Sequence, residues 1–157
     1  HDALPIWAVL VSLLLLLTLA VSASAAAVKM TVGVRFWRES GDKESMADSA
    51  VDTTREATLT RQPNGTFTLE LPVKQLSSMN MTGCLTGIAI GEVNYDGTLS
   101  GDLSDGTAVL TLKNLPASVL TGSDSSKALA VTCSIKMDTI LLGDISTSAK
   151  MSIWVER

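Results

Sequence analysis

Few side chains in this 157-residue chain have the types and spacing that catalysis or metal binding requires. The one histidine is His1, which precedes a long apolar stretch. Ser-His-Asp and Cys-His nucleophile systems need an imidazole base, and many zinc and haem sites use imidazole as a ligand. The sequence also has no pair of acids in a setting typical of acid–base catalysis. We therefore expect that the protein is not an enzyme.

Two cysteines and six methionines supply the soft donor atoms of the chain. Cys84 follows Gly83 in the segment MTGCL, and Cys133 belongs to the alternating segment KALAVTCSIKM. In an exported domain, two cysteines can form a disulfide if their Cα atoms come within about 7 Å of each other. Two free, buried thiols are the alternative, and the sequence leaves both open.

A short amphipathic segment, KESMADSAV at residues 43–51, differs from its surroundings. It combines three charged residues with apolar residues at helical spacing, and Ser45 stands just before the first apolar one, Met46. The segment is too short for an ordinary helix and predicts a single helical turn. On composition alone, one interpretation is that Met46 and Val51 plug one open end of the domain, and a functional role for the turn is equally open.

The first 27 residues predict export. Residues 3–27 carry no charged side chain, and the apolar centre WAVLVSLLLLLTLAV gives way to SASAAAV. This profile is typical of a cleaved secretion signal peptide, and a membrane anchor is the alternative because about 20 apolar residues span a bilayer. Since the chain begins with His1 and lacks a basic leading region, we expect residues to be missing upstream. Residues 28–157 are predicted to lie outside the cytoplasm.

Residues 28–157 have the length of one domain. The net charge of the whole chain is −4, which argues against a nucleic-acid partner because such binding needs a basic surface. A membrane partner is expected only through residues 1–27, if they are not cleaved. Because the chain ends at Arg157 without a sorting motif, we expect it to be one module of a longer surface protein.

Alternating apolar and polar residues predict strands through most of this domain. The segments VKMTVGVRFW (28–37), KALAVTCSIKM (127–137) and AKMSIWV (149–155) have the period of two that half-buried strands show. Asn64-Gly65 is a strong hairpin signal between the segments at 55–61 and 66–73, and Asp-Gly pairs follow at 96–97 and 105–106. This pattern predicts an antiparallel, immunoglobulin-like β-sandwich with residues 43–51 as its lone helical turn.

The order of strand, ESMADSAV, strand, Asn-Gly turn and alternating strand resembles the NEAT domain, and MNMTGCLTGI at 79–88 is similar to a segment of NEAT-like modules. NEAT domains are secreted or wall-attached β-sandwiches of Gram-positive bacteria. The resemblance covers most of residues 28–157. It implies a haem pocket between a short 3₁₀ helix after the first strand and the hairpin of the last two strands. It implies haem contacts at Ser45 (to a propionate), Met46 (over a porphyrin face), Val51, Ile145, Ala149 and Met151.

The sequence departs from this family at the iron ligand. Haem-binding members carry a Tyr-x-x-x-Tyr pair entering the last strand, and the first tyrosine is the usual ligand. The corresponding positions here are about Ile145 and Ala149. The only tyrosine is Tyr95, beside the Asp96-Gly97 turn, where we expect a turn-flanking aromatic.

Methionines are the remaining candidates for axial ligands. Met46 lies on the implied pocket lip, and Met151 falls on the same strand face as the missing tyrosines, so the two thioethers could hold a haem between them. A methionine on a strand face is, however, commonly core filler. Met137 is a weaker candidate, and a Cys84 thiolate would lack a supporting partner.

Two functions follow from these observations. The first is a non-enzymatic secreted or cell-surface module that binds haem, or exchanges it with a haem-carrying protein, for iron acquisition. It predicts an open apolar groove between residues 44–51 and the hairpin at 138–151. The alternative is a structural or adhesion module that contacts other surface proteins and binds no haem. It predicts that Met46, Ile145 and their neighbours fill the groove.

Overall fold

The computed structural model describes residues 26–78, 81–138 and 143–157. Most of the predicted leader therefore lies outside the described residues, and no helix within them is long and apolar enough to cross a membrane. The described residues form three short 3₁₀ helices: η1 (Met46–Ala50), η2 (Ala117–Val119) and η3 (Ser125–Lys127). They also form ten strands: β1 (Val28–Arg38), β2 (Ala57–Arg61), β3 (Phe67–Pro72), β4 (Leu76–Ser78), β5 (Met81–Ile90), β6 (Val93–Asp96), β7 (Thr98–Ser100), β8 (Val109–Leu115), β9 (Leu129–Met137) and β10 (Asp144–Val155).

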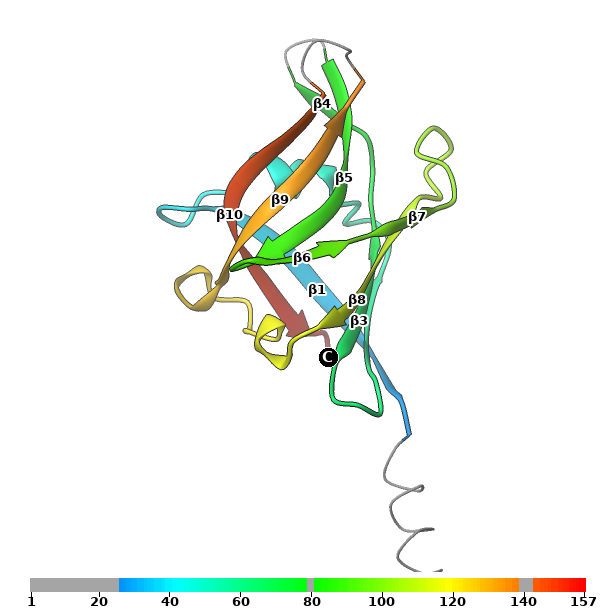
Figure 1. The fold of residues 1–157 in the computed structure, drawn as a ribbon, viewed down its shortest axis with the longest axis vertical. Helices are drawn as coiled ribbons and strands as arrows, with labels where there is room; N and C mark the ends of the chain where they lie inside the picture. The colour runs from blue at the N-terminus through cyan, green and yellow to red at the C-terminus, as the bar shows by residue number, and fades with distance from the viewer. Residues whose placement is uncertain (1–25, 79–80, 139–142) are drawn as a thin grey trace, which may run out of the picture.

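The strands wrap around one core (Figure 1). They are hydrogen-bonded in the order β4-β5-β9-β10-β1-β2-β3-β8-β7, and β6 pairs with β5. Strand β1 joins two halves of the sandwich, one formed by β4, β5, β9 and β10 and the other by β2, β3, β8 and β7. It pairs with β2 over Val28–Val32 and with β10 over Val32–Arg38. All of the pairings are antiparallel. The predicted antiparallel β-sandwich is confirmed.

Alternation along the strands builds the core, as the sequence predicts. In β1 the residues Val32, Val34 and Phe36 are buried, whereas their neighbours in sequence are more exposed. The same alternation runs through β9, where Val131, Cys133, Ile135 and Met137 face inward. The largest fully buried side chains come from both halves of the sandwich: Phe36, Leu59, Leu69, Leu71, Leu85, Ile88, Leu110, Leu112, Leu115, Ile135, Met151 and Ile153. Apolar burial of this extent is the main stabilising term of the fold.

Two of the predicted turns, Asn64-Gly65 and Asp96-Gly97, have different roles in the structure. Asn64-Gly65 forms the predicted hairpin: Gly65 has a φ of 86°, and the N–H of Gln62 donates to Thr66 O at 2.8 Å. Asp96-Gly97 instead carries the chain from β6, on one half of the sandwich, to β7, on the other. A Cβ at Gly97 would lie 2.8 Å from the backbone oxygen of Thr86 and 2.3 Å from Leu110 Cδ1, so this crossing favours glycine.

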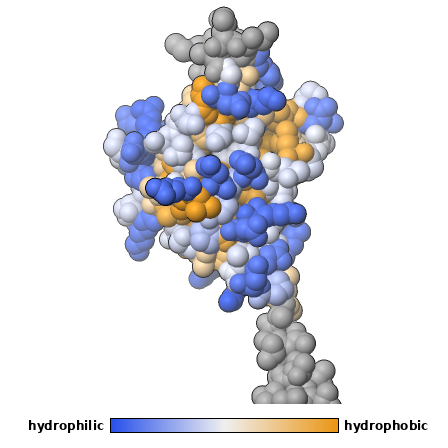
Figure 2. All heavy atoms as spheres, viewed as in Figure 1, coloured by the Kyte–Doolittle hydropathy of each residue, from blue (hydrophilic) through white to orange (hydrophobic). Residues whose placement is uncertain are grey.

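The prediction of a lone helical turn is wrong, because η2 and η3 add two more short 3₁₀ helices. The predicted turn itself is confirmed as η1. On the face of the molecule in Figure 2, the apolar side chains of the described residues gather in small, separate patches between hydrophilic ones. The described part of this face therefore presents no broad apolar surface.

Candidate functional site

The η1 turn begins at Ser45, which caps it. The side chain of Ser45 accepts a hydrogen bond from Ala47 N at 3.2 Å, and Ser45 O accepts one from Asp48 N at 3.0 Å. A serine at this position satisfies N–H groups that the first turn of a helix leaves without partners. Ser45 itself is buried, whereas Met46, which follows it, is 38% exposed. The cap therefore presents Met46 at the surface.

Asp48 fastens η1 to β1. Its Oδ1 accepts a hydrogen bond of 2.8 Å from Phe36 N, and Phe36 O accepts one of 2.9 Å from Ser45 N. Arg35 Nε lies 3.9 Å from Asp48 Oδ2, and Arg35 Nη1 lies 3.2 Å from Glu44 Oε1. Burial raises the pKa of the Asp48 carboxyl above its ordinary value, against the opposing effects of the Phe36 N–H and Arg35. The turn is thus held to β1 by backbone and side-chain contacts together.

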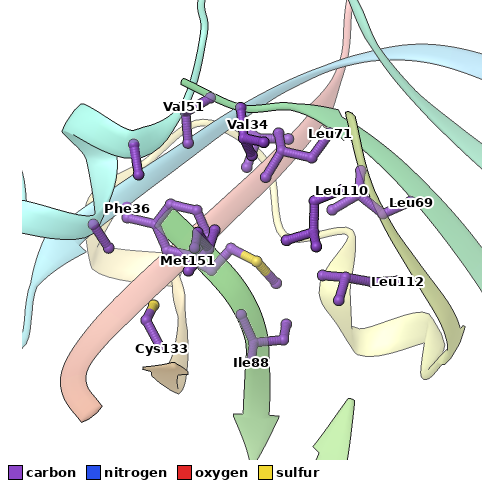
Figure 3. Packing of buried hydrophobic residues seen from close by; sticks show 14 of the residues in the cluster. Val34, Phe36, Val51, Leu69, Leu71, Ile88, Leu110, Leu112, Cys133 and Met151 are labelled. Carbon is purple, nitrogen blue, oxygen red and sulfur yellow. The ribbon is translucent and has the colours of Figure 1, made fainter. Parts of the chain in front are cut away.

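The inner face of the β9–β10 hairpin is the implied opposite wall of a haem pocket. Ile145 is half-buried and packs against the core, whereas Ala149 and Met151 are part of the core itself. Figure 3 shows the thioether of Met151 reaching into the cluster, among Phe36, Ile88 and Leu112. Met151 is 0% exposed, so in this conformation its sulfur does not face a groove. Residues 139–142 of the predicted wall lie outside the described residues.

The structure brings together only part of the predicted site. Ser45 and Met46 are adjacent at the start of η1, where Ser45 is the buried N-cap and Met46 is exposed. Val51 follows that turn but is buried, and it forms a bridge with Val73 in the core. Met137 is also buried, and it packs over β5, where a Cβ at Gly83 would lie 2.7 Å from its Sδ. Val51, Met137, Ala149 and Met151 therefore act as core residues here.

Tyr95 does not replace the missing hairpin tyrosines. It lies on β6 opposite Ile88 of β5, half-buried, and it packs against the core. This placement agrees with the expected turn-flanking aromatic. Within the described residues, no group of three or more His, Cys, Asp or Glu side chains could hold a metal ion.

The suggested disulfide between Cys84 and Cys133 is not formed, and both residues are free cysteines. Cys84 pairs across the ladder with Lys136, and Cys133 pairs with Ile88. The two cysteines are therefore about 10 Å apart along neighbouring strands, beyond the reach of a disulfide. Cys133 is buried in the core, and Cys84 is partly exposed. Burial raises the pKa of the Cys133 thiol to about 12.

A separate hollow of about 450 Å³ lies beside β1. It is lined by residues 31–35 of β1, the connection at residues 51–57, the end of β3, and Trp154 and Glu156 of the C-terminal segment. Sequence reasoning missed it, because its walls are far apart in the chain. Gly33 was a possible local signal, since glycine inside a strand often marks a close approach of another group.

Comparisons with known proteins support the fold. No protein-family model matches the sequence, and no curated protein matches it either. Among solved structures, the chain is similar to the NEAT5 domain of IsdX2, a B. anthracis hemophore in complex with heme, with 10% identity and a TM-score of 0.52. The match covers 84% of this chain and 99% of that domain. A mutant of the same domain, also in complex with heme, matches with the same identity and TM-score over 98% of its length. The domain therefore has a NEAT-like fold.

Proposed function

We propose that this domain is a non-enzymatic, extracellular or cell-surface module that binds haem and transfers it for iron acquisition. The observation that carries the proposal is the similarity of its fold, over almost the whole compared domain, to a domain solved with heme. The exposed Met46 on the turn after the first strand adds to this support. The proposed haem position is the lip formed by Ser45 and Met46.

The residues on this lip fit a haem in part. The Met46 thioether is a soft donor, which suits ferrous iron better than ferric iron, and the side chain can also cover a porphyrin face. The Ser45 hydroxyl oxygen accepts the Ala47 N–H, and its own O–H remains a donor for a propionate. Arg38, at the end of β1, and Lys43, in the loop that follows, are exposed, and Arg38 N donates to Lys43 O. Their positive charges would favour a propionate on this side of the turn.

The hairpin does not fit the predicted second ligand. A thioether must reach the iron to bind it, and Met151 is 0% exposed inside the core. Ligation by Met46 and Met151 together would require the core to open between Phe36 and β10. We therefore propose Met46 as the protein contact at the iron face, with Ile145, which is half-buried, as the hairpin contact.

A scaffold or adhesion module that binds no haem is the second candidate, because buried side chains fill the hairpin wall. Ala149 and Met151 stand on the face where the resemblance implies haem contacts, yet both belong to the core. Such a module would act through contacts with other surface proteins.

A haemin titration followed at the Soret band, in the ferric state and after reduction, tests the haem proposal. We expect a saturable shift, which Met46→Ala weakens at least tenfold. Leu120→Ala is the matched control, because Leu120 has the same exposed fraction as Met46, 38%, and lies beyond η2. Met46→Leu keeps the apolar bulk without the sulfur. If it binds like the wild type, Met46 covers the porphyrin; if it loses the ferrous spectrum, Met46 is a ligand.

The absence of a saturable shift in both redox states would overturn the haem proposal and favour the scaffold. Equal losses in Met46→Ala and Leu120→Ala would place the haem elsewhere than on the proposed lip.

A further inference from the structure

The hollow beside β1 exists because β1 changes partners. Its ladder with β2 ends at the pair Val32–Ala57, whereas its ladder with β10 continues as far as Arg38. Beyond Val32, the connection at residues 52–56 replaces a strand on that side of β1. The resulting space of about 450 Å³ lies within the range of small-molecule sites, about 300–1,000 Å³.

The main chain of Val34 points into this space. Phe36 directs both its N–H and its C=O away from β10, to Asp48 and Ser45, and strand geometry gives Val34 the same direction. The residue opposite Val34 on β10, Ile153, confirms this direction. Its N–H donates to Thr121 Oγ1 and its C=O accepts from Thr121 N and Gly122 N, so neither group is bonded to β1. Within the described residues, no turn, loop or side-chain hydrogen bond uses the Val34 N–H or C=O. A buried residue thus offers one donor and one acceptor to the hollow.

An aromatic ring and a carboxylate form one wall. A Cβ at Gly33 would lie 2.3 Å from Cε2 and Cζ2 of Trp154 and 2.7 Å from Oε1 of Glu156. Both side chains therefore lie across the glycine, and the indole packs against the β1 backbone. Only glycine permits this arrangement. The packing on Gly33 holds the Trp154 indole and the Glu156 carboxylate beside the Val34 main chain.

The opposite wall is also fixed before any ligand binds. Asp52 accepts hydrogen bonds from Thr54 Oγ1 at 2.6 Å, Arg55 Nε at 2.9 Å and Thr54 N at 3.1 Å, and these contacts lower the pKa of its carboxyl to about 2. Arg55 Nη2 donates to Ala108 O at 2.7 Å and Val73 O at 3.2 Å. Within the described residues, no hydrogen bond uses Arg55 Nη1. The loop is thereby held in place, and Arg55 is among the residues that line the hollow.

The charges of the walls restrict the ligand. Arg35 and Arg55 are each paired with acids, whereas Glu56 and Glu156 form no ion pair within the described residues. These two carboxylates disfavour an anion. A purely apolar ligand would leave the Val34 N–H and C=O buried without partners. Hydroxyl groups both donate and accept, and the apolar face of a sugar ring can pack on an indole.

We propose that this hollow is a carbohydrate-binding site for an uncharged hexopyranose unit. The ring packs against Trp154, and its hydroxyls bond to the Val34 main chain, Glu156 and the Arg55 guanidinium. The site is separate from the Ser45–Met46 lip and does not depend on haem binding.

Titration of the ¹⁵N-labelled protein with methyl β-D-glucopyranoside and N,N′-diacetylchitobiose, followed by NMR, tests this site. We expect the Val34 amide and the Trp154 indole N–H to shift saturably, with a Kd of about 1 mM or tighter for at least one sugar. Trp154→Ala and Glu156→Gln should each weaken binding about tenfold. Glu92→Gln, an exposed acid in the β5–β6 turn, is the matched control and should bind like the wild type.

Three results would overturn the proposal. They are the absence of a saturable shift with either sugar, equal losses in Glu156→Gln and Glu92→Gln, and binding of D-glucuronate as tight as that of the neutral sugars. Because Glu156 is exposed, Glu156→Gln remains decisive if Trp154→Ala does not fold.

Discussion

The Asp48 carboxylate accepts a 2.8 Å hydrogen bond from the main-chain N–H of Phe36, twelve residues earlier in the chain. This contact joins η1 to the strand at the centre of the sandwich. It uses the N–H that β1 would otherwise offer to a neighbouring strand. The position of the Ser45–Met46 lip depends on this contact, since η1 lies beside β1 at Phe36 in place of a strand.

We expect Asp48→Ala to destabilise the fold by about 1–3 kcal/mol, because the Phe36 N–H would then be buried without an acceptor. Urea unfolding at pH 7 measures this change. Asp42→Ala, in the exposed loop before η1, is the control and should cost little. Equal unfolding midpoints for the two variants would contradict the role given to Asp48.

The contributions of Asp48 and Asp52 to the free energy of unfolding should depend on pH in opposite directions. The pKa of Asp48 is raised in the fold because ionising the buried carboxyl costs stability, so the pH-dependent part of its contribution is fully present below about pH 3.8 and is lost as the pH rises through the folded pKa. The hydrogen bond to the Phe36 N–H is a separate contribution, which persists at pH 7. The pKa of Asp52 is lowered to about 2, so its contribution is present above about pH 3.8 and is lost as the pH falls towards 2. Unfolding midpoints of the wild type, Asp48→Asn and Asp52→Asn from acidic to neutral pH measure both. Parallel curves for the two variants would refute this assignment.

Met151 should behave as a core residue. Met151→Ala is expected to lower the free energy of unfolding by about 2–5 kcal/mol, because it leaves a cavity beside Phe36. Met151→Leu keeps the volume and should cost less than about 1.5 kcal/mol, with an unchanged Soret spectrum if haem binds. Loss of that spectrum in a stable Met151→Leu protein would instead support ligation by this sulfur.

The two thiols should differ in reactivity. Burial raises the pKa of Cys133 to about 12, and burial also raises the pKa of the partly exposed Cys84. Since the thiolate is the reactive form, a chromogenic disulfide reagent should modify Cys84 slowly in the folded protein and Cys133 only after unfolding. Failure to detect either thiol in unfolded, unreduced protein would indicate a disulfide after all.

Much of the fold could be predicted because its signals are local. Asn64-Gly65 and the alternation of Phe67, Leu69 and Leu71 lie within one hairpin, and turn chemistry and a period of two are enough to predict it. The turn at Ser45 and Met46 was also predictable, from a capping residue followed by apolar spacing.

The sites were less predictable because they depend on long-range pairing. Sequence alternation correctly placed Met151 on the inward face of β10, but only the packing shows that this face meets the core instead of a groove. The hollow joins Gly33 to Trp154, and the register of β1 with β10 alone brings the two together.

Mapping the position of a bound porphyrin tests the central claim most directly. Zinc protoporphyrin is diamagnetic, so its addition to the ¹⁵N-labelled protein permits a residue-by-residue comparison of amide shifts. The haem proposal predicts saturable shifts centred on Met46 and Ala47 of η1 and on Ile145 of β10. Shifts confined to other surfaces, or no saturable shifts at all, would contradict it.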